Sequence, residues 1–308
     1  SGRIIASANR SRIMLRLART GAHLGNLSGH SGRVLALSCD FFGLKLSDEP
    51  ENSHRCSKPY HLLASGGSDG VACVWKLPCF LCKVKTSNDY VSRLDGYHSE
   101  DDKVIKTIWN RHIRKEKTNR ATMMNYNAKP RTIEPVARHL HPRGAWVLDT
   151  EISRRGLLAT AASDGIVRLF KPLESNILIM ELEGHEWYST AVAFAPGFHI
   201  LASASMDTTV RIWFYQERLD QAGHDEPSLC SGYSSMSAST LADDTNQSIK
   251  STTVRCLLLE NTEGRTIHSL TWSPDGRYLI AGGNSDLPLF WLFEEREKMM
   301  SFYERVCG

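Results

Sequence analysis

A short phrase that joins a turn aspartate to a closing aromatic residue recurs along this chain. Its copies span residues 68–75, 163–170 and 206–213, and they end on Trp75, Phe170 and Trp213. The last two copies lie about 43 residues apart. A period of roughly 40–45 residues is typical of the four-stranded blades of a β-propeller. The spacing therefore predicts an all-β fold before any residue chemistry is considered.

The internal pattern of one copy agrees with this prediction. Residues 191–194, 200–205 and 209–213 are predicted strands, and Pro196 and Gly197 favour a turn between the first two. Val210 and Ile212 share one face of the last strand while Arg211 points to the other. Asp207 lies in a turn, where its carboxylate can accept backbone N–H groups.

Five such units can be counted along the 308 residues. We expect about five recognisable blades from a seven-bladed ring, and a fragment of that ring because the chain begins inside a blade. The sequence predicts one domain over residues 1–308, with insertions at about 45–60, 79–136 and 216–255. The recognisable units are a partial one at 4–15 and further ones at 29–75, 141–170, 184–213 and 264–291.

These units resemble WD40 repeats, in which a loop histidine, a strand serine or threonine, a turn aspartate and a closing tryptophan form a buried hydrogen-bonded tetrad. The resemblance implies two tetrads and leaves open whether Ser203 or Ser205 takes part in the second. We interpret these residues as structural, because a satisfied buried network explains a His–Asp pair more simply than catalysis does. The implied tetrads are His30, Ser65, Asp69 and Trp75, and His185, Ser203 or Ser205, Asp207 and Trp213.

The composition of the chain and the motifs it lacks exclude several classes of function. A net charge of +3 is too small to indicate a nucleic-acid binder, and no run of 18 apolar residues is present. Cys79 and Cys82 form a Cys-x-x-Cys pair without the second pair that a zinc ribbon needs. Phosphate-loop, Gly-x-Ser-x-Gly and His-Glu-x-x-His motifs are also missing. We therefore expect no enzyme, no metal and no cofactor.

The largest insertion carries a run of positive charge beside a tryptophan. Such a run could meet an acidic protein surface or phosphates, and tryptophan is enriched at interaction hot spots. The alternative is a solvated loop without a partner. The residues assigned to this candidate partner-binding loop are Trp109, Arg111, Arg114, Lys115, Lys117 and Arg120.

The order of the units resembles the N-terminal propeller of the HIRA histone chaperone family over about residues 27–300. Shared features are an Ala-Ser-Gly-Gly-x-Asp phrase at 64–69 before a long insertion, and a Ser-Pro-Asp-Gly turn at 273–276. The resemblance implies a nuclear, non-enzymatic scaffold for histone deposition, chromatin assembly and transcriptional repression. Its partners would be histones and other histone-chaperone subunits. It implies indirect association with chromatin, and neither a membrane nor a small-molecule substrate.

Two other functions fit the same residues. The phrase Leu-Glu-Gly-His-Glu at 182–186 and the Cys-Ser-Gly loop at 230–232 resemble the WD-repeat scaffold of cytosolic iron–sulfur protein assembly. That function would place the protein in the cytoplasm. A generic adaptor in ubiquitin ligation or RNA processing is the third interpretation.

Overall fold

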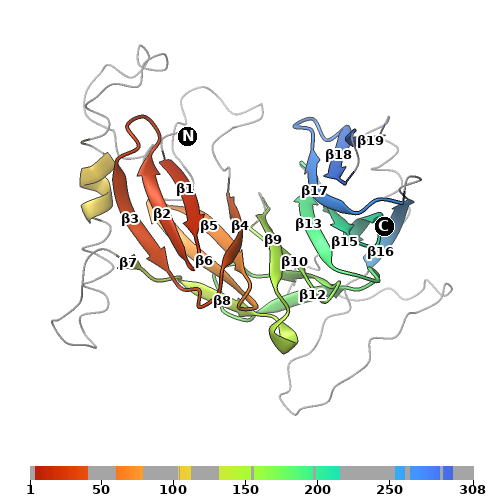
Figure 1. The fold of residues 1–308 in the computed structure, drawn as a ribbon, viewed down its shortest axis with the longest axis horizontal. Coiled ribbons are helices and arrows are strands. Elements are labelled where there is room, and N and C mark those ends of the chain that lie inside the picture. The colour runs from red at the N-terminus through yellow and green to blue at the C-terminus, as the bar shows by residue number, and fades with distance from the viewer. Residues whose placement is uncertain are drawn as a thin grey trace, which may run out of the picture.

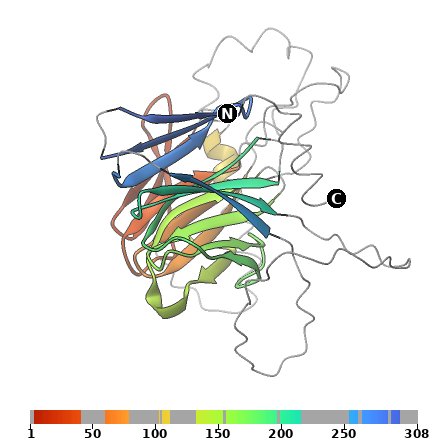
Figure 2. The same ribbon diagram turned by 90° about the vertical axis from the view of Figure 1, so that its right-hand side faces the viewer.

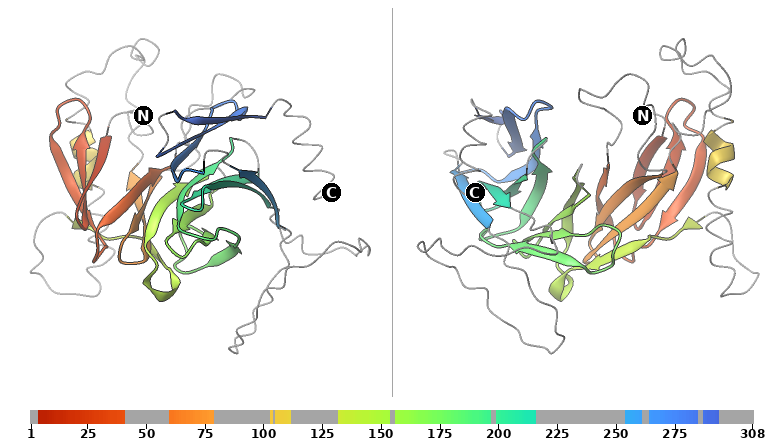
Figure 3. Two further views of the ribbon diagram at one scale, coloured as in Figure 1. Left: turned by 45° about the vertical axis from the view of Figure 1, so that its right-hand side comes forward. Right: turned by 180° about the vertical axis from the view of Figure 1, so that it is seen from behind.

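The computed structural model describes residues 4–40, 60–78, 103, 105–111, 132–153, 156–196, 199–215, 254–260, 264–284 and 287–293. These residues form five β-sheets that follow one another in an arc (Figure 1). The first sheet and the fifth lie at opposite ends of this arc, as the view from behind also shows (Figure 3), and in the view turned by 90° the fifth sheet lies in front of the first (Figure 2). The predicted all-β architecture of WD40 propeller blades is thereby confirmed.

Each sheet corresponds to one predicted unit. The first holds β1 (Ile4–Asn9), β2 (Arg12–Leu17), β3 (His23–Ser28) and β7 (Thr132–Ile133), and the second holds β4 (Val34–Cys39), β5 (Tyr60–Gly67), β6 (Val71–Pro78) and β8 (Ala137–Leu140). The third holds β9 (Val147–Ile152), β10 (Leu158–Ala162), β11 (Val167–Phe170) and β12 (Leu178–Leu182). The fourth holds β13 (Ser189–Phe194), β14 (Ile200–Ser205), β15 (Thr209–Tyr215) and β16 (Val254–Glu260), and the fifth holds β17 (Ile267–Trp272), β18 (Tyr278–Gly283) and β19 (Leu289–Leu292). A short 3-10 helix, η1 (Pro142–Gly144), precedes β9.

Tight turns join the second and third strands of the repeated sheets. Gly70, Gly165 and Thr208 occupy the same place in three of these turns, with φ of 74°, 81° and 72°. A β-branched residue rarely adopts such a φ, whereas glycine adopts it readily. The aspartate before each of them accepts a backbone N–H two residues ahead, as Asp207 does from Thr209 at 2.9 Å. The turn aspartate is thus a local device that shapes the hairpin.

Apolar cores fill the spaces between neighbouring sheets. Leu15 of the first sheet packs in one cluster with Trp75 of the second, and Val147 of the third sheet packs with Val74 of the second. Equivalent clusters join the third sheet to the fourth and the fourth to the fifth. Stability therefore comes from the contact of each sheet with the next, as in other repeat proteins.

The two longest insertions interrupt their sheets at the same topological point. One leaves after β6 and the chain returns as β8, while the other leaves after β15 and the chain returns as β16. In both cases the returning strand is the outermost strand of the interrupted sheet. The first insertion also contributes β7, which pairs in parallel with β3 of the first sheet. This insertion is therefore partly built into the fold.

Side-chain carboxyl groups of β9 in the third sheet form hydrogen bonds to the backbone of β13 in the fourth sheet. Asp149 and Glu151 lie two residues apart on β9 and project toward β13. The backbone N–H of Val192 donates to Asp149 at 3.0 Å, and that of Phe194 donates to Glu151 at 2.5 Å. Among the described strands β13 pairs only with β14, so these carboxyl groups accept N–H groups from an edge strand of the fourth sheet.

These carboxyl groups make stability depend on pH. Burial raises the pKa of Glu151 to about 8 and that of Asp149 to about 6. Burial also lowers the pKa of His139 and His141 to about 4. A raised folded-state pKa means that stability is lost as pH rises through it, whereas the neutral histidines lose stability as pH falls from their unfolded pKa near 6.5. Below about pH 6.5 the carboxyl groups and the histidines change stability in opposite directions. Above that pH the titration of Glu151 dominates the change in stability.

We expect the free energy of unfolding to fall by about 1 kcal/mol between pH 6.5 and pH 8, since the folded Glu151 still holds part of a proton that the unfolded chain has already lost, while the last titration of the unfolded histidines offsets some of this loss. Chemical denaturation across this range measures the change. The Glu151→Gln variant keeps an acceptor oxygen without a titrating proton and should flatten the profile. Glu174→Gln, at an exposed ion pair with Lys171, is the matched control and should leave the profile as it is. An equal slope in both variants would contradict this assignment.

Candidate protein-interaction face

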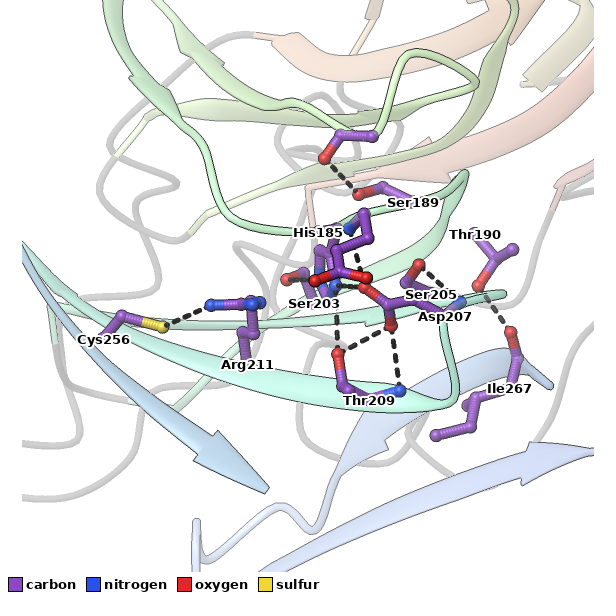
Figure 4. Close-up of polar contacts among 12 residues, drawn as sticks. His185, Ser189, Thr190, Ser203, Ser205, Asp207, Thr209, Arg211, Cys256 and Ile267 are labelled. Atoms are coloured by element: carbon purple, nitrogen blue, oxygen red, sulfur yellow. Dashed lines mark hydrogen bonds and ion pairs between the residues drawn. The ribbon is translucent and has the colours of Figure 1, made fainter. Parts of the chain in front are cut away.

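A hydrogen-bonded tetrad fixes the loop that enters β13, and Figure 4 shows three of its members, His185, Ser203 and Asp207. His185 Nδ1 lies 2.9 Å from Asp207 Oδ2, and its Nε2 lies 2.7 Å from Ser203 Oγ. Trp213 Nε1 donates to the same Oγ at 2.8 Å. Ser205 instead accepts the backbone N–H of Asp207 at 3.0 Å. The structure thus selects Ser203 from the two serines that the sequence left open.

The second predicted tetrad is less complete. His30 Nδ1 lies 3.0 Å from Asp69 Oδ1, and its Nε2 lies 2.6 Å from Ser65 Oγ. Asp69 also accepts the backbone N–H of Ser31 at 2.8 Å. Trp75 packs 6.1 Å from the His30 ring, but its buried Nε1 has no hydrogen-bond partner among the described residues. Three of the four predicted members are therefore joined by hydrogen bonds, and the fourth contributes by packing.

The third unit departs further from the tetrad pattern. His141 Nε2 bonds Thr160 Oγ1 at 2.8 Å, and the ring packs edge-on against Phe170. Asp164 pairs with Arg168 instead, with 2.7 Å between Oδ2 and Nη2. Arg168 is buried and also bonds Glu181. An ion pair within the sheet therefore takes the place of the aspartate–histidine contact, and Phe170 has no indole N–H to offer Thr160.

The protonation states of these networks suit a structural role. Burial alone would raise the pKa of Asp207, but hydrogen bonds from His185 and Thr209 outweigh it and hold the pKa well below its usual range. The pKa of Asp69 is lowered in the same way by His30 despite its burial. Both ring nitrogens of His185 are occupied and its side chain is fully enclosed. The His–Asp pairs therefore hold loops in place and have no free nitrogen to offer a substrate.

The hydrogen-bonded networks of the second, third and fourth sheets position a set of loops at one end of the sheets, which we name the loop face. It comprises residues 29–33, 141–146 and 183–188 together with the turns at 68–70, 163–165 and 206–208. Backbone bonds tie each loop to the turn of its own sheet, with Arg33, Trp146 and Tyr188 accepting at 2.8–3.0 Å. Neighbouring units are also joined, because Ser189 Oγ donates to Gly165 O at 3.0 Å. The loop face is thus a continuous and rigidly held surface.

Three aromatic side chains project from this face. Trp146 is 53% exposed, Trp187 56% and Tyr188 39%, and the rings of the last two meet edge-on at 6.1 Å. The turn at 163–165 lies between the two tryptophans, because Ser163 bonds Trp146 and Gly165 approaches the Trp187 backbone. Sequence reasoning missed these residues. An aromatic residue two to five positions after a loop histidine was the available signal.

Of the candidate partner-binding residues in the basic insertion, the structure describes Trp109 and Arg111. Trp109 is 1% exposed and packs with Ile13 and Leu15 of the first sheet. Its ring covers Gly25 so closely that a Cβ at position 25 would lie 2.9 Å from ring atoms of Trp109. This corrects the expectation that Trp109 anchors a partner, since the ring is an internal anchor for the helical residues 105–111. Arg111 is exposed at the end of that helix, whereas Arg114, Lys115, Lys117 and Arg120 lie outside the described residues.

No group of three or more histidine, cysteine, aspartate or glutamate side chains in the described residues is arranged to hold a metal ion. Cys79 and Cys82 fall outside these residues. Within the described part of the chain, no helix has both the length and the apolar character to cross a bilayer.

Comparison with known proteins agrees with the repeat geometry. Residues 176–213 and 253–287 match the model of the WD domain, G-beta repeat; the first range covers β12–β14 and most of β15, and the second covers β16–β18. The chain contains WD40 repeats. The two matched ranges flank the insertion after β15, which explains why the repeat reads as interrupted in the sequence.

Several WD-repeat proteins are similar to parts of the chain. Nuclear distribution protein nudF 1 of Talaromyces marneffei is 40% identical over 74 residues, which cover 24% of this chain and 16% of that protein. Human WD repeat and HMG-box DNA-binding protein 1 is 28% identical over 158 residues, covering 46% of this chain and 14% of that protein. The Drosophila melanogaster SEC13 homolog is 48% identical over 59 residues, with 18% and 17% covered. The matches thus span about a sixth of the length of these relatives.

Proposed function

We propose that this WD40-repeat chain is a non-enzymatic scaffold that binds protein partners through its loop face. The observation that carries the proposal is the exposure of Trp146 and Trp187 on loops that a buried network holds rigid. Tryptophan is enriched among the residues that dominate protein interfaces. A rigid loop also loses little conformational entropy on binding. Exposed aromatics on preorganised loops therefore favour recognition of another protein.

The more specific proposal is a nuclear subunit for histone deposition and chromatin assembly. It rests on the unit order shared with the HIRA histone chaperone family, including the phrase at 64–69 and the turn at 273–276. The likeness to a human protein whose name includes DNA binding is compatible with this setting. The proposed partners are core histones and other histone-chaperone subunits, and the proposed location is the nucleus.

Co-elution of the purified chain with purified core histones in size-exclusion chromatography tests this proposal. We expect a complex that the double variant Trp146→Ala and Trp187→Ala weakens. Phe290→Ala is the matched control, because Phe290 is an exposed aromatic residue of β19 away from the loop face. Failure to bind histones, together with a cytoplasmic location, would overturn the chromatin assignment. Partner binding that ignores the two tryptophans would overturn the role of the loop face.

A further inference from the structure

The loop that enters β13 combines aromatic rings with free carboxylates. Glu183 and Glu186 are exposed on the same six-residue loop as Trp187 and Tyr188. Neither carboxylate forms an ion pair within the described residues, whereas Asp164 and Glu181 nearby are both engaged by Arg168. Two negative charges on this loop are therefore available to a partner.

The loop is held ready for contact by its buried centre. His185 lies between the two glutamates and is fixed by Asp207 and Ser203 (Figure 4). The backbone N–H of Glu186 also donates to Asp207 at 3.0 Å. With its centre anchored inward, the loop presents Glu183, Glu186 and the two rings outward. The nearby cation Arg211 packs against Gly184 and donates to Cys256 Sγ, and within the described residues it forms no ion pair with Glu183 or Glu186.

Aromatic faces and carboxylates attract the same kind of group. A guanidinium or ammonium ion is drawn to the face of an aromatic ring, and a carboxylate adds a charge-assisted hydrogen bond. A phosphate or an acidic segment would be repelled by the two glutamates, and a purely apolar segment would gain nothing from them. We propose that the loop 183–188 binds an arginine- or lysine-bearing peptide segment of a partner protein. This inference rests on the proposed scaffold function and adds the chemical class of the segment recognised.

Isothermal titration of the purified chain with three short peptides tests the inference. The probes alternate glycine with arginine, with glutamate or with serine. We expect the arginine peptide to bind most tightly and to weaken as salt is added. Trp187→Ala, and separately the double variant Glu183→Gln and Glu186→Gln, should each weaken it roughly five- to tenfold. The matched controls Phe290→Ala and Glu174→Gln should bind as the parent chain does.

The outcomes separate this inference from the proposed function. If the three peptides bind equally, or if none of them binds, the basic-segment proposal is overturned. This conclusion would hold even if binding of a partner protein still depends on Trp146 and Trp187. Selective binding of the arginine peptide through Glu183 and Glu186 would uphold it, even where histones fail to bind. Circular dichroism of each variant establishes that the exposed substitutions leave the fold intact.

Discussion

Replacing Trp109 by alanine is expected to release the helical residues 105–111 from the first sheet. The ring is fully buried among Ile13, Leu15 and neighbouring side chains, and truncating such a tryptophan costs about 3–5 kcal/mol. Because the helix belongs to an insertion, the loss should fall mainly on its docking and less on global unfolding. Limited proteolysis, read by mass spectrometry, should show faster cleavage within residues 79–131 while the sheets persist.

Two comparisons sharpen this test. Gly25→Ala acts from the opposite side, since its new Cβ would press on the Trp109 ring at 2.9 Å, and it should loosen the same helix. Trp187→Ala removes an exposed tryptophan and should leave the cleavage rate of the insertion unchanged. Parent-like cleavage in both Trp109→Ala and Gly25→Ala would contradict the role of this ring as an internal anchor.

Replacing Ser203 by alanine is expected to lower the free energy of unfolding by about 2–4 kcal/mol, because it strands two buried groups. Its Oγ meets both His185 Nε2 and Trp213 Nε1, and neither atom has another hydrogen-bond partner in the described residues. Urea denaturation measures the loss. Leaving a buried donor or acceptor without a partner costs more free energy than one hydrogen bond contributes. The loss should therefore exceed the loss expected for a buried serine that makes a single hydrogen bond.

Ser205 is the matched control for this substitution. It is equally buried on the same strand, but among the described residues its Oγ accepts only the backbone N–H of Asp207. Ser205→Ala should therefore cost about 1 kcal/mol. Ser65→Ala should fall between the two, since Ser65 bonds His30 while Trp75 Nε1 does not reach it. A larger loss for Ser205→Ala than for Ser203→Ala would overturn this assignment of the tetrad.

The aspartate turns illustrate how much of the fold the sequence encodes. An aspartate followed by a residue of positive φ closes a hairpin through contacts within three residues, so Asp69, Asp164 and Asp207 can be recognised from sequence alone. The alternation along 209–213 likewise separates the buried Val210 and Ile212 from Arg211. These signals are local, and each predicted unit corresponds to one sheet.

Other features depend on which sheets meet. In the sequence, Trp109 stands beside a basic run and Trp187 lies in a loop. Nothing in the sequence indicates that Trp109 is buried and Trp187 exposed. The partner of Asp164 is equally hidden, because Arg168 competes with His141 only once the third sheet has formed. The raised pKa of Glu151 arises from burial against β13, some forty residues along the chain.

The sequence by itself determined the repeat, the all-β architecture, the turn aspartates and the histidine–aspartate pairing of two units. Their spacing and alternation express contacts within a strand or across one turn, which neighbouring residues in the chain specify. Only the tertiary structure decided that Ser203 completes its tetrad, that Trp109 is internal, and that Trp146, Trp187 and Tyr188 project from the loop face. Exposure and pairing of these side chains depend on what packs across from them, and that is set by the stacking of one sheet on the next.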